Sequence, residues 1–320
     1  MEITARAPGM IILAGEHAVV HGYTAVASSI DLYTVVSLRL HSARGCWIRL
    51  FMANQKNQRS VISLGFSISS TPTLCSLETV KSITALVDEQ SFPETRIGLA
   101  SGVCAFLWLY TSILGFKPGT VIVTSELPLG AALGSSAAYC VALSAALPAF
   151  SDSMKLDVNK WAFEEEKIIH GRPFGVDNSV STFGSMTGID SNMPLRMLIT
   201  NTKVGRDKKA LIAKVSARKS RHPDALCCVL NAIESISKEW STIIQSHTVD
   251  DLSVTANEER LRELMEMNQG LLLSIGVTHA SIETVLQTAM KHKLASKLTG
   301  AGGGGCWLTF TYLYPRSSSL

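Results

Sequence analysis

The sequence predicts an α+β protein of two lobes, with a boundary near residue 194. Strand and helix patterns are mixed over residues 1–194, whereas helix patterns dominate residues 195–320. Apolar residues make up 46% of the 320 residues and charged residues 17%, a balance that supports packed cores and excludes intrinsic disorder. The net charge of +3 and the scattered lysines and arginines do not indicate a nucleic-acid partner.

The first part of the chain is expected to form strands. Apolar and β-branched residues at 4–7 and 10–14 predict the opening strand segments. Residues 33–40 alternate and are rich in strand formers, and residues 46–51 are expected to be their hairpin partner. The polar, serine-rich stretch 54–73 is expected to be a surface excursion.

The middle of the chain combines a long apolar helix with a strand and further helices. Residues 94–114 have a nearly continuous apolar helix pattern, so this helix is expected at the centre of the fold. Gly171 and Pro173 are stop signals that end a helix at 159–170. The other elements expected here are helices at 74–89 and 137–147 and a strand at 121–125.

Beyond residue 194 the sequence predicts a strand, a run of helices and a closing strand. The strands are expected at 195–201 and 306–312. Helical spacing occupies 207–219, 223–246, 258–273 and 281–293.

Two uncharged stretches, 97–116 and 127–151, are long enough to be considered as membrane spans. Prolines, glycines and small polar residues interrupt the second, and no positive cluster flanks the first, so both are expected to be helices in a soluble core. Seven cysteines without a zinc-like spacing favour reduced thiols in the cytoplasm. The ending Ser318-Ser319-Leu320 differs from a peroxisomal Ser-Lys-Leu signal at its middle residue, so cytoplasm remains the expected compartment.

The strongest local signal of a binding site is a loop of glycine and serine at 128–136. It links a strand to an alanine-rich helix, which places backbone N–H groups at a helix N-terminus that suits an anion. The Ser135 and Ser136 hydroxyls suit phosphate or Mg²⁺. No lysine follows Gly134, so this is not a Walker A loop. The alternative is a helix start whose small residues only pack closely.

Two carboxylates further along could serve phosphoryl transfer. Glu166 closes the run Glu164-Glu165-Glu166, and Asp177 follows eleven residues later. Three adjacent glutamates cannot share one helix face, so Glu166 is expected to point inward while its neighbours are solvated. One carboxylate could hold Mg²⁺ and the other could orient a hydroxyl nucleophile. From these residues alone, a charged helix face followed by a turn is the favoured interpretation.

Two other segments carry patterns of interest. The cluster at 300–305 matches G-x-G-x-x-G, but the helix, second strand and acidic residue of a dinucleotide site do not follow it. A backbone-lined wall against a ligand suits this cluster better than a flexible linker. Glu16 and His17 lie at the end of a strand, where a lone histidine is more often structural than functional.

Together, and in this order, these segments resemble the GHMP kinase superfamily and, within it, the mevalonate kinase family. The similar motifs are residues 7–22, 126–139, 169–178 and 296–306. The resemblance runs over nearly the whole chain. It implies a two-lobed GHMP kinase fold, in which residues 1–194 form a mixed α/β nucleotide-binding and catalytic domain and residues 195–320 form a shorter, helix-rich C-terminal domain.

The resemblance also implies a reaction, namely ATP- and Mg²⁺-dependent phosphorylation of the 5-hydroxyl of mevalonate in isoprenoid and sterol biosynthesis, by a homodimer with its site between the lobes. Asp177 matches the catalytic base, and Ser136 and Glu166 match the magnesium ligands. The residues that match the substrate side are Glu16, His17, Gly302 and Gly303. Those that match nucleotide contacts are Asn54, Ser125, Gly130, Ala131, Ala132, Leu133, Gly134, Ser135 and Ser136.

The sequence departs from the family pattern in three places. Met10 replaces a lysine that is thought to stabilise the reacting charge, and losing such a group costs on the order of 10²- to 10³-fold in rate. Ala132 replaces a glycine, so its methyl group would hinder ATP if the position needs a positive φ. The chain ends fifteen residues after Gly305, whereas the family's C-terminal lobe continues. A catalytically impaired sensor or partner protein that still binds ligand is therefore the alternative to an enzyme.

Overall fold

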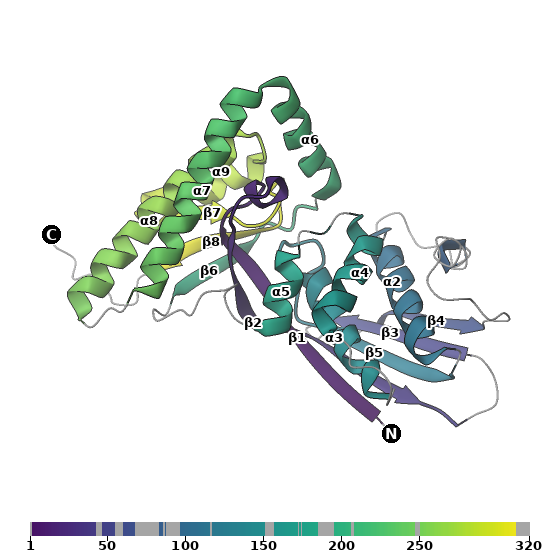
Figure 1. The fold of residues 1–320 in the computed structure, drawn as a ribbon. Helices are drawn as coiled ribbons and strands as arrows, with labels where there is room; N and C mark the ends of the chain where they lie inside the picture. The colour runs from purple at the N-terminus through teal and green to yellow at the C-terminus, as the bar shows by residue number, and fades with distance from the viewer. Residues whose placement is uncertain are drawn as a thin grey trace. The chain divides into compact units, whose positions relative to one another are not determined.

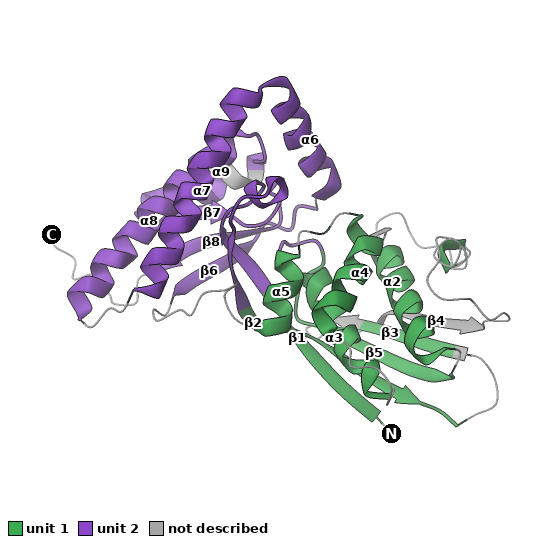
Figure 2. Ribbon diagram, in the orientation of Figure 1, with its two compact units in different colours: residues 1–9, 30–129, 134–184 green, residues 10–29, 130–133, 185–320 purple. Residues whose placement is uncertain are grey.

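The computed structural model describes residues 2–42, 47–54, 60–67, 83–85, 87, 97–115, 117–150, 157–171, 173, 175–184, 195–205, 208–246 and 250–311. The chain forms two compact units (Figure 2). Unit 1 consists of residues 1–9, 30–129 and 134–184, and unit 2 consists of residues 10–29, 130–133 and 185–320. The boundary expected near residue 194 between two sequence domains remains a prediction.

Unit 1 is built on a five-stranded sheet with the strand order β1-β2-β5-β3-β4 (Figure 1). Strand β5 pairs antiparallel with β2 on one side and parallel with β3 on the other. Val121 and Val123 of β5 are buried, as expected for a central strand. The strands are β1 (Glu2–Ala14), β2 (Val26–Leu40), β3 (Trp47–Asn54), β4 (Ser60–Ser67) and β5 (Gly119–Ser125).

Two expectations about these strands are wrong. Residues 33–40 and 46–51 do not form a hairpin, because β5 lies between β2 and β3. The expected surface excursion at 54–73 contains strand β4, which pairs antiparallel with β3. Alternating apolar residues reveal that a segment is a strand, but the partner of that strand depends on the whole sheet. The helix expected at 74–89 falls mostly outside the described residues.

The helices of unit 1 pack against one another on one side of this sheet (Figure 1). Helix α4 packs on α2 and α3, and α5 packs on α3 and α4. The expected central helix is confirmed as α2, in which residues 103–110 are buried. No helix within the described ranges is both long enough and apolar enough to cross a membrane. The helices are α2 (Ile97–Leu114), α3 (Ser135–Ala146), α4 (Val158–His170) and α5 (Val176–Phe183).

Unit 2 combines a three-stranded antiparallel sheet, in the order β6-β8-β7, with long helices. Its core joins the helices α7 and α8 to Leu298 and Trp307 of the sheet, and both of these side chains are fully buried. The strands are β6 (Arg196–Asn201), β7 (Ser296–Leu298) and β8 (Cys306–Thr311). The helices are η1 (Ala18–His21), α6 (Lys208–Arg221), α7 (Pro223–Gln245), α8 (Asp251–Ser274) and α9 (Ala280–Lys291).

Candidate active site

The loop before α3 has a backbone suited to phosphate. The φ angles of Gly130, Ala132 and Gly134 are positive, at 69°, 67° and 67°, and the residues between them are not among those with positive φ. A backbone in which residues of positive φ alternate with other residues can turn successive N–H groups toward a common anion. Helix α3 begins directly after Gly134, so the positive end of its dipole adds to this effect. The binding of phosphate by this loop remains a prediction.

Ala132 has a positive φ, which is the condition under which its methyl group is expected to hinder ATP. Its φ of 67° lies in the left-handed region that glycine adopts readily and alanine does not. The loop is anchored on both sides of this residue. The N–H of Met10 donates to the Leu133 carbonyl at 3.0 Å, and the N–H of Cys306 donates to the Ala131 carbonyl at 2.8 Å. These bonds hold Ala132 in a conformation that costs strain energy.

Three polar side chains meet at the N-terminus of α3. The Ser136 hydroxyl donates to Oε1 of Glu166 at 3.0 Å, and Nε2 of His170 lies 3.0 Å from Ser136 Oγ. Glu166 and His170 lie four residues apart on α4, so they share one face of that helix. The structure thus brings together the two residues that match magnesium ligands. The sequence pattern by itself assigns no role to His170, although the sequence contains its i, i+4 spacing from Glu166.

The expectation about the neighbours of Glu166 is half wrong. Glu164 is solvated, with 42% of its side chain exposed, and pairs with Lys167. Glu165, however, is fully buried and accepts a hydrogen bond of 2.9 Å from Ser144 of α3. Helix α4 packs against both α2 and α3, so its buried face is wide enough to include Glu165 as well as Glu166. Burial raises the pKa of the Glu165 carboxyl well above its ordinary value, and the nearby charge of Glu166 adds to this.

Asp177 is the second residue of α5 and is partly buried. Gly175, with a φ of 78°, caps this helix, and the structure therefore has a helix where the sequence pattern favours a turn. Because α5 packs on α3 and α4, Asp177 lies on a helix that contacts those carrying Ser136 and Glu166. A carboxylate in the first turn is also favoured by the helix dipole.

Two residues that match nucleotide contacts lie at adjacent strand ends. Asn54 ends β3 and Ser125 ends β5, and the two are register partners in the parallel pairing of these strands. The Ser125 hydroxyl lies 2.8 Å from Oγ1 of Thr34 and accepts a hydrogen bond of 3.2 Å from the N–H of Leu127. Both positions therefore lie at the C-terminal ends of neighbouring strands, and the chain continues from Ser125 into the loop before α3.

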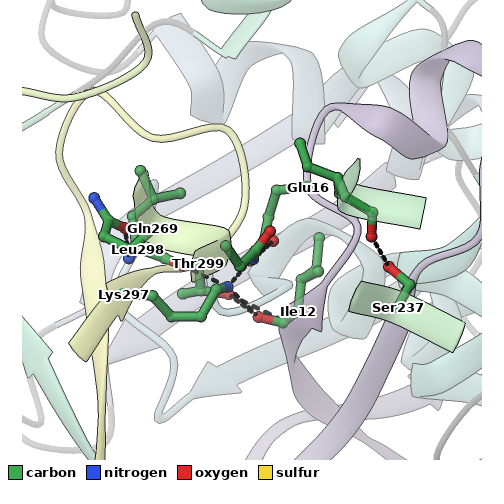
Figure 3. A network of polar contacts seen from close by, with 9 residues as sticks. Ile12, Glu16, Ser237, Gln269, Lys297, Leu298 and Thr299 are labelled. Atoms are coloured by element: carbon green, nitrogen blue, oxygen red, sulfur yellow. Dashed lines mark hydrogen bonds and ion pairs between the residues drawn. The ribbon is translucent and has the colours of Figure 1, made fainter. Parts of the chain in front are cut away.

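In unit 2, Glu16 forms a buried ion pair with Lys297 (Figure 3). Neither side chain is exposed. The Lys297 ammonium also donates to the carbonyls of Ile12 at 3.2 Å and Leu298 at 2.8 Å, so each of its hydrogens has an acceptor. Nδ2 of Asn268 donates to the other oxygen of Glu16 at 3.0 Å. Burial lowers the pKa of Lys297, and the Glu16 charge opposes that shift.

His17 and the glycine cluster are adjacent in unit 2. Nε2 of His17 lies 2.9 Å from the carbonyl oxygen of Ala301, and His17 has a φ of 59°, unusual for a non-glycine residue. A Cβ at Gly302, whose φ is 76°, would overlap the carbonyl oxygen of Val277. Close packing of backbones thus requires this glycine. A substrate role for Gly302, Gly303, Glu16 and His17 remains a prediction.

The arrangement in unit 1 suits Mg²⁺ bound together with phosphate. Neighbouring ligands of an octahedral Mg²⁺ ion at 2.0–2.1 Å lie about 3.0 Å apart, and Ser136 Oγ and Glu166 Oε1 are 3.0 Å apart. Within the described ranges, no group of three or more His, Cys, Asp or Glu side chains could hold a metal by itself. Magnesium is commonly bound by one or two protein ligands, with substrate phosphates completing its shell.

Comparison with known proteins defines the class. The family model "GHMP kinases N terminal domain" matches residues 99–185, and the model "GHMP kinases C terminal" matches residues 253–314. The crystal structure of L. major mevalonate kinase in complex with R-mevalonate has a TM-score of 0.71 and 20% identity, covering 97% of this chain and 87% of that one. The Methanococcus jannaschii mevalonate kinase structure gives 0.70 with 20% identity, covering 98% and 91%. These similarities confirm the GHMP kinase fold.

Curated relatives define the family more closely. The mevalonate kinase of Arabidopsis thaliana is 57% identical over 350 residues, covering 97% of this chain and 90% of the relative. That of Mus musculus is 39% identical, covering 95% and 84%. The chain belongs to the mevalonate kinase family.

Proposed function

We propose that this chain transfers the γ-phosphoryl group of ATP to the 5-hydroxyl of mevalonate, giving 5-phosphomevalonate and ADP in isoprenoid biosynthesis. The observation that carries the proposal is the 3.0 Å contact between Ser136 and Glu166 at the end of a phosphate-binding loop. The 57% identity to the Arabidopsis enzyme supports the choice of substrate.

The loop before α3 and residues of α3, α4 and α5 divide the chemistry between them. The backbone from Gly130 to Ser136 holds the phosphates of ATP, and Ser136 and Glu166 hold Mg²⁺. The bound Mg²⁺ supplies positive charge that offsets the phosphate charge. Asp177 accepts the proton of the 5-hydroxyl while that oxygen bonds to the γ-phosphorus. The bond between this phosphorus and the bridging oxygen breaks, and ADP leaves with the electron pair.

The ion pair in unit 2 is consistent with an anionic substrate. Mevalonate carries a carboxylate, which an unpaired carboxylate of Glu16 would repel. Lys297 neutralises Glu16, so the segment around Glu16 and His17 can accept an anion without that repulsion. The substrate side of the proposal rests on this neutralisation and on the family match.

Two observations favour the alternative of an impaired protein that binds ligand without turnover. The thioether of Met10 cannot supply the charge of a lysine, and Met10 is only 2% exposed. Ala132 is strained where glycine would not be.

The family also supports a cytoplasmic homodimer, and such a dimer would have twice the chain's mass of 34.5 kDa in light scattering.

The identity of the product tests the proposal. Purified protein is incubated with ATP, Mg²⁺ and an equimolar mixture of mevalonate, galactose and homoserine, and the products are identified by mass spectrometry. We expect phosphorylated mevalonate as the dominant product. Phosphorylation of galactose or homoserine in preference would overturn the substrate, and no phosphorylated product from folded protein would favour the binding alternative.

A further inference from the structure

We propose that His170 is a positioning residue, which holds the Ser136 hydroxyl in the orientation that a magnesium ligand needs. The inference rests on the proposed function, because it assigns a partner to the Ser136 and Glu166 pair. It starts from the distance of 3.0 Å between Nε2 of His170 and Oγ of Ser136.

The hydrogen-bonding capacity of a serine hydroxyl makes this contact directional. The hydroxyl has one proton and two lone pairs. The proton of Ser136 is donated to Glu166, so the contact with His170 uses a lone pair of Ser136 and a hydrogen on Nε2. The second lone pair stays available for a metal ion. With both partners in place, the remaining lone pair has a fixed direction.

The position of His170 is itself well determined. It is the last residue of α4, and the following Gly171, with a φ of 78°, ends the helix by donating its N–H to the Lys167 carbonyl at 2.8 Å. Glu166 lies one helical turn earlier on the same face. Helix α4 therefore supplies both partners of Ser136, and Ser136 lies in the first turn of α3, the helix packed against α4. A shift of α4 would move both partners together.

The energetic consequence concerns metal binding. Without His170, only the hydrogen bond to Glu166 restrains rotation of the Ser136 hydroxyl about its Cβ–Oγ bond, so the remaining lone pair is less well ordered when the metal binds. Removing the hydrogen-bond partner of a metal ligand typically reduces metal affinity or activity by about 10- to 100-fold. A residue that only fills space would have no such effect on metal binding.

The test compares His170→Leu, which removes the hydrogen bond, with His170→Gln, whose amide can donate from a similar position. The primary readout is binding without turnover, namely the rise in melting temperature caused by ATP across a titration of free Mg²⁺, with ATP plus EDTA as the blank. We expect His170→Leu to need about 10- to 100-fold more Mg²⁺ for half of the effect. His170→Gln should regain most of the loss, and the KM for mevalonate should stay within about 2-fold.

Two further variants keep the result interpretable. His292→Leu, at an exposed position in unit 2, is the matched control and should behave as the parent. Adding His170→Leu to Ser136→Ala should cause no further loss, because the proposed effect passes through Ser136. If His170→Leu does not fold, His170→Asn serves in its place, because the asparagine side chain is shorter than that of glutamine and does not reach Ser136.

Several results would overturn the assignment. They are an unchanged Mg²⁺ requirement in His170→Leu, an equal loss in His170→Gln, or an additional loss in the double variant. Failure of the proposed function looks different. In that case the folded parent protein would form no phosphorylated mevalonate, while the rise in its melting temperature with ATP and Mg²⁺ would still allow the His170 variants to be compared.

Discussion

At Ala132 the loop backbone has a conformation that is unfavourable for a residue with a Cβ atom. Its φ of 67° costs alanine about 1–2 kcal/mol, whereas glycine adopts this region freely. Glycine loses about 0.5–1 kcal/mol through its greater entropy in the unfolded chain. The strain term is the larger, so the balance favours glycine at this position.

We therefore expect Ala132→Gly to raise the free energy of unfolding by about 0.5–1 kcal/mol and to lower the KM for ATP. Urea denaturation and steady-state kinetics measure the two effects. Ala131→Gly is the matched control. Ala131 is 4% exposed and is not among the residues with positive φ, so the same exchange should destabilise the protein. A loss of stability in Ala132→Gly would contradict the argument from strain.

The resemblance to the family predicts a lysine at the position of Met10, whose side chain is almost completely buried. We expect Met10→Lys to raise kcat by about 10²- to 10³-fold, because a preorganised cation stabilises the charge of the transferred phosphoryl group. Burial of an ammonium also costs folding energy, so the variant should melt at a lower temperature without ligand. Steady-state kinetics and a melting curve measure both.

Met10→Leu is the matched control, since it keeps the volume and apolar character of methionine. Its kcat should equal that of the parent. An unchanged kcat in Met10→Lys, with the protein folded, would show that another group already supplies the positive charge.

At the scale of elements, the Glu16–Lys297 ion pair ties the segment after β1 to β7, and Asn268 adds α8. Replacing one partner of a buried ion pair by an uncharged residue leaves the other charge uncompensated, which costs about 3–5 kcal/mol. We expect Lys297→Met and Glu16→Leu each to reduce the free energy of unfolding strongly. The combination Lys297→Met with Glu16→Leu should cost several kcal/mol less than the sum of single losses.

Urea denaturation of the single and double variants measures this coupling. Lys238→Met is the matched control in the same unit. Its ammonium lies 3.1 Å from Glu234, but the Lys238 side chain is 68% exposed, so the loss should be about 0–1 kcal/mol. Losses in Lys297→Met as small as those in Lys238→Met would mean that the buried pair does not hold these elements together.

The elements also show which parts of the fold were predictable. The helices α2, α3 and α4 follow from local apolar spacing and from stop signals such as Gly171, all of which act within a few residues. The position of β5 between β2 and β3 could not be predicted in this way, because pairing joins Val36 to Val123 across most of unit 1. Helix α5 was missed because its eight residues are too few to show a clear period.

At the scale of the whole molecule, the candidate site was predictable where a motif is continuous in sequence and not where it depends on distant contacts. The phosphate loop follows from a strand, small residues and a helix start. The partnership of Ser136 with His170 joins residues 34 positions apart, and that of Glu16 with Lys297 joins residues 281 positions apart. Neither local spacing nor composition contains that information.

The central claim is that this chain phosphorylates mevalonate with Asp177 as the base. The most direct measurement is an assay of ADP release with ATP and Mg²⁺, with and without mevalonate, for the parent and for Asp177→Asn. Asp224→Asn is the matched control, because Asp224 also lies in the first turn of a helix.

We expect release of ADP that depends on mevalonate in the parent and in Asp224→Asn, and a loss of about 10²- to 10⁴-fold in Asp177→Asn. Mevalonate-dependent release that survives Asp177→Asn would contradict the role of Asp177. No such release from folded parent protein that ATP still stabilises would contradict the kinase itself, and would assign the chain to ligand binding.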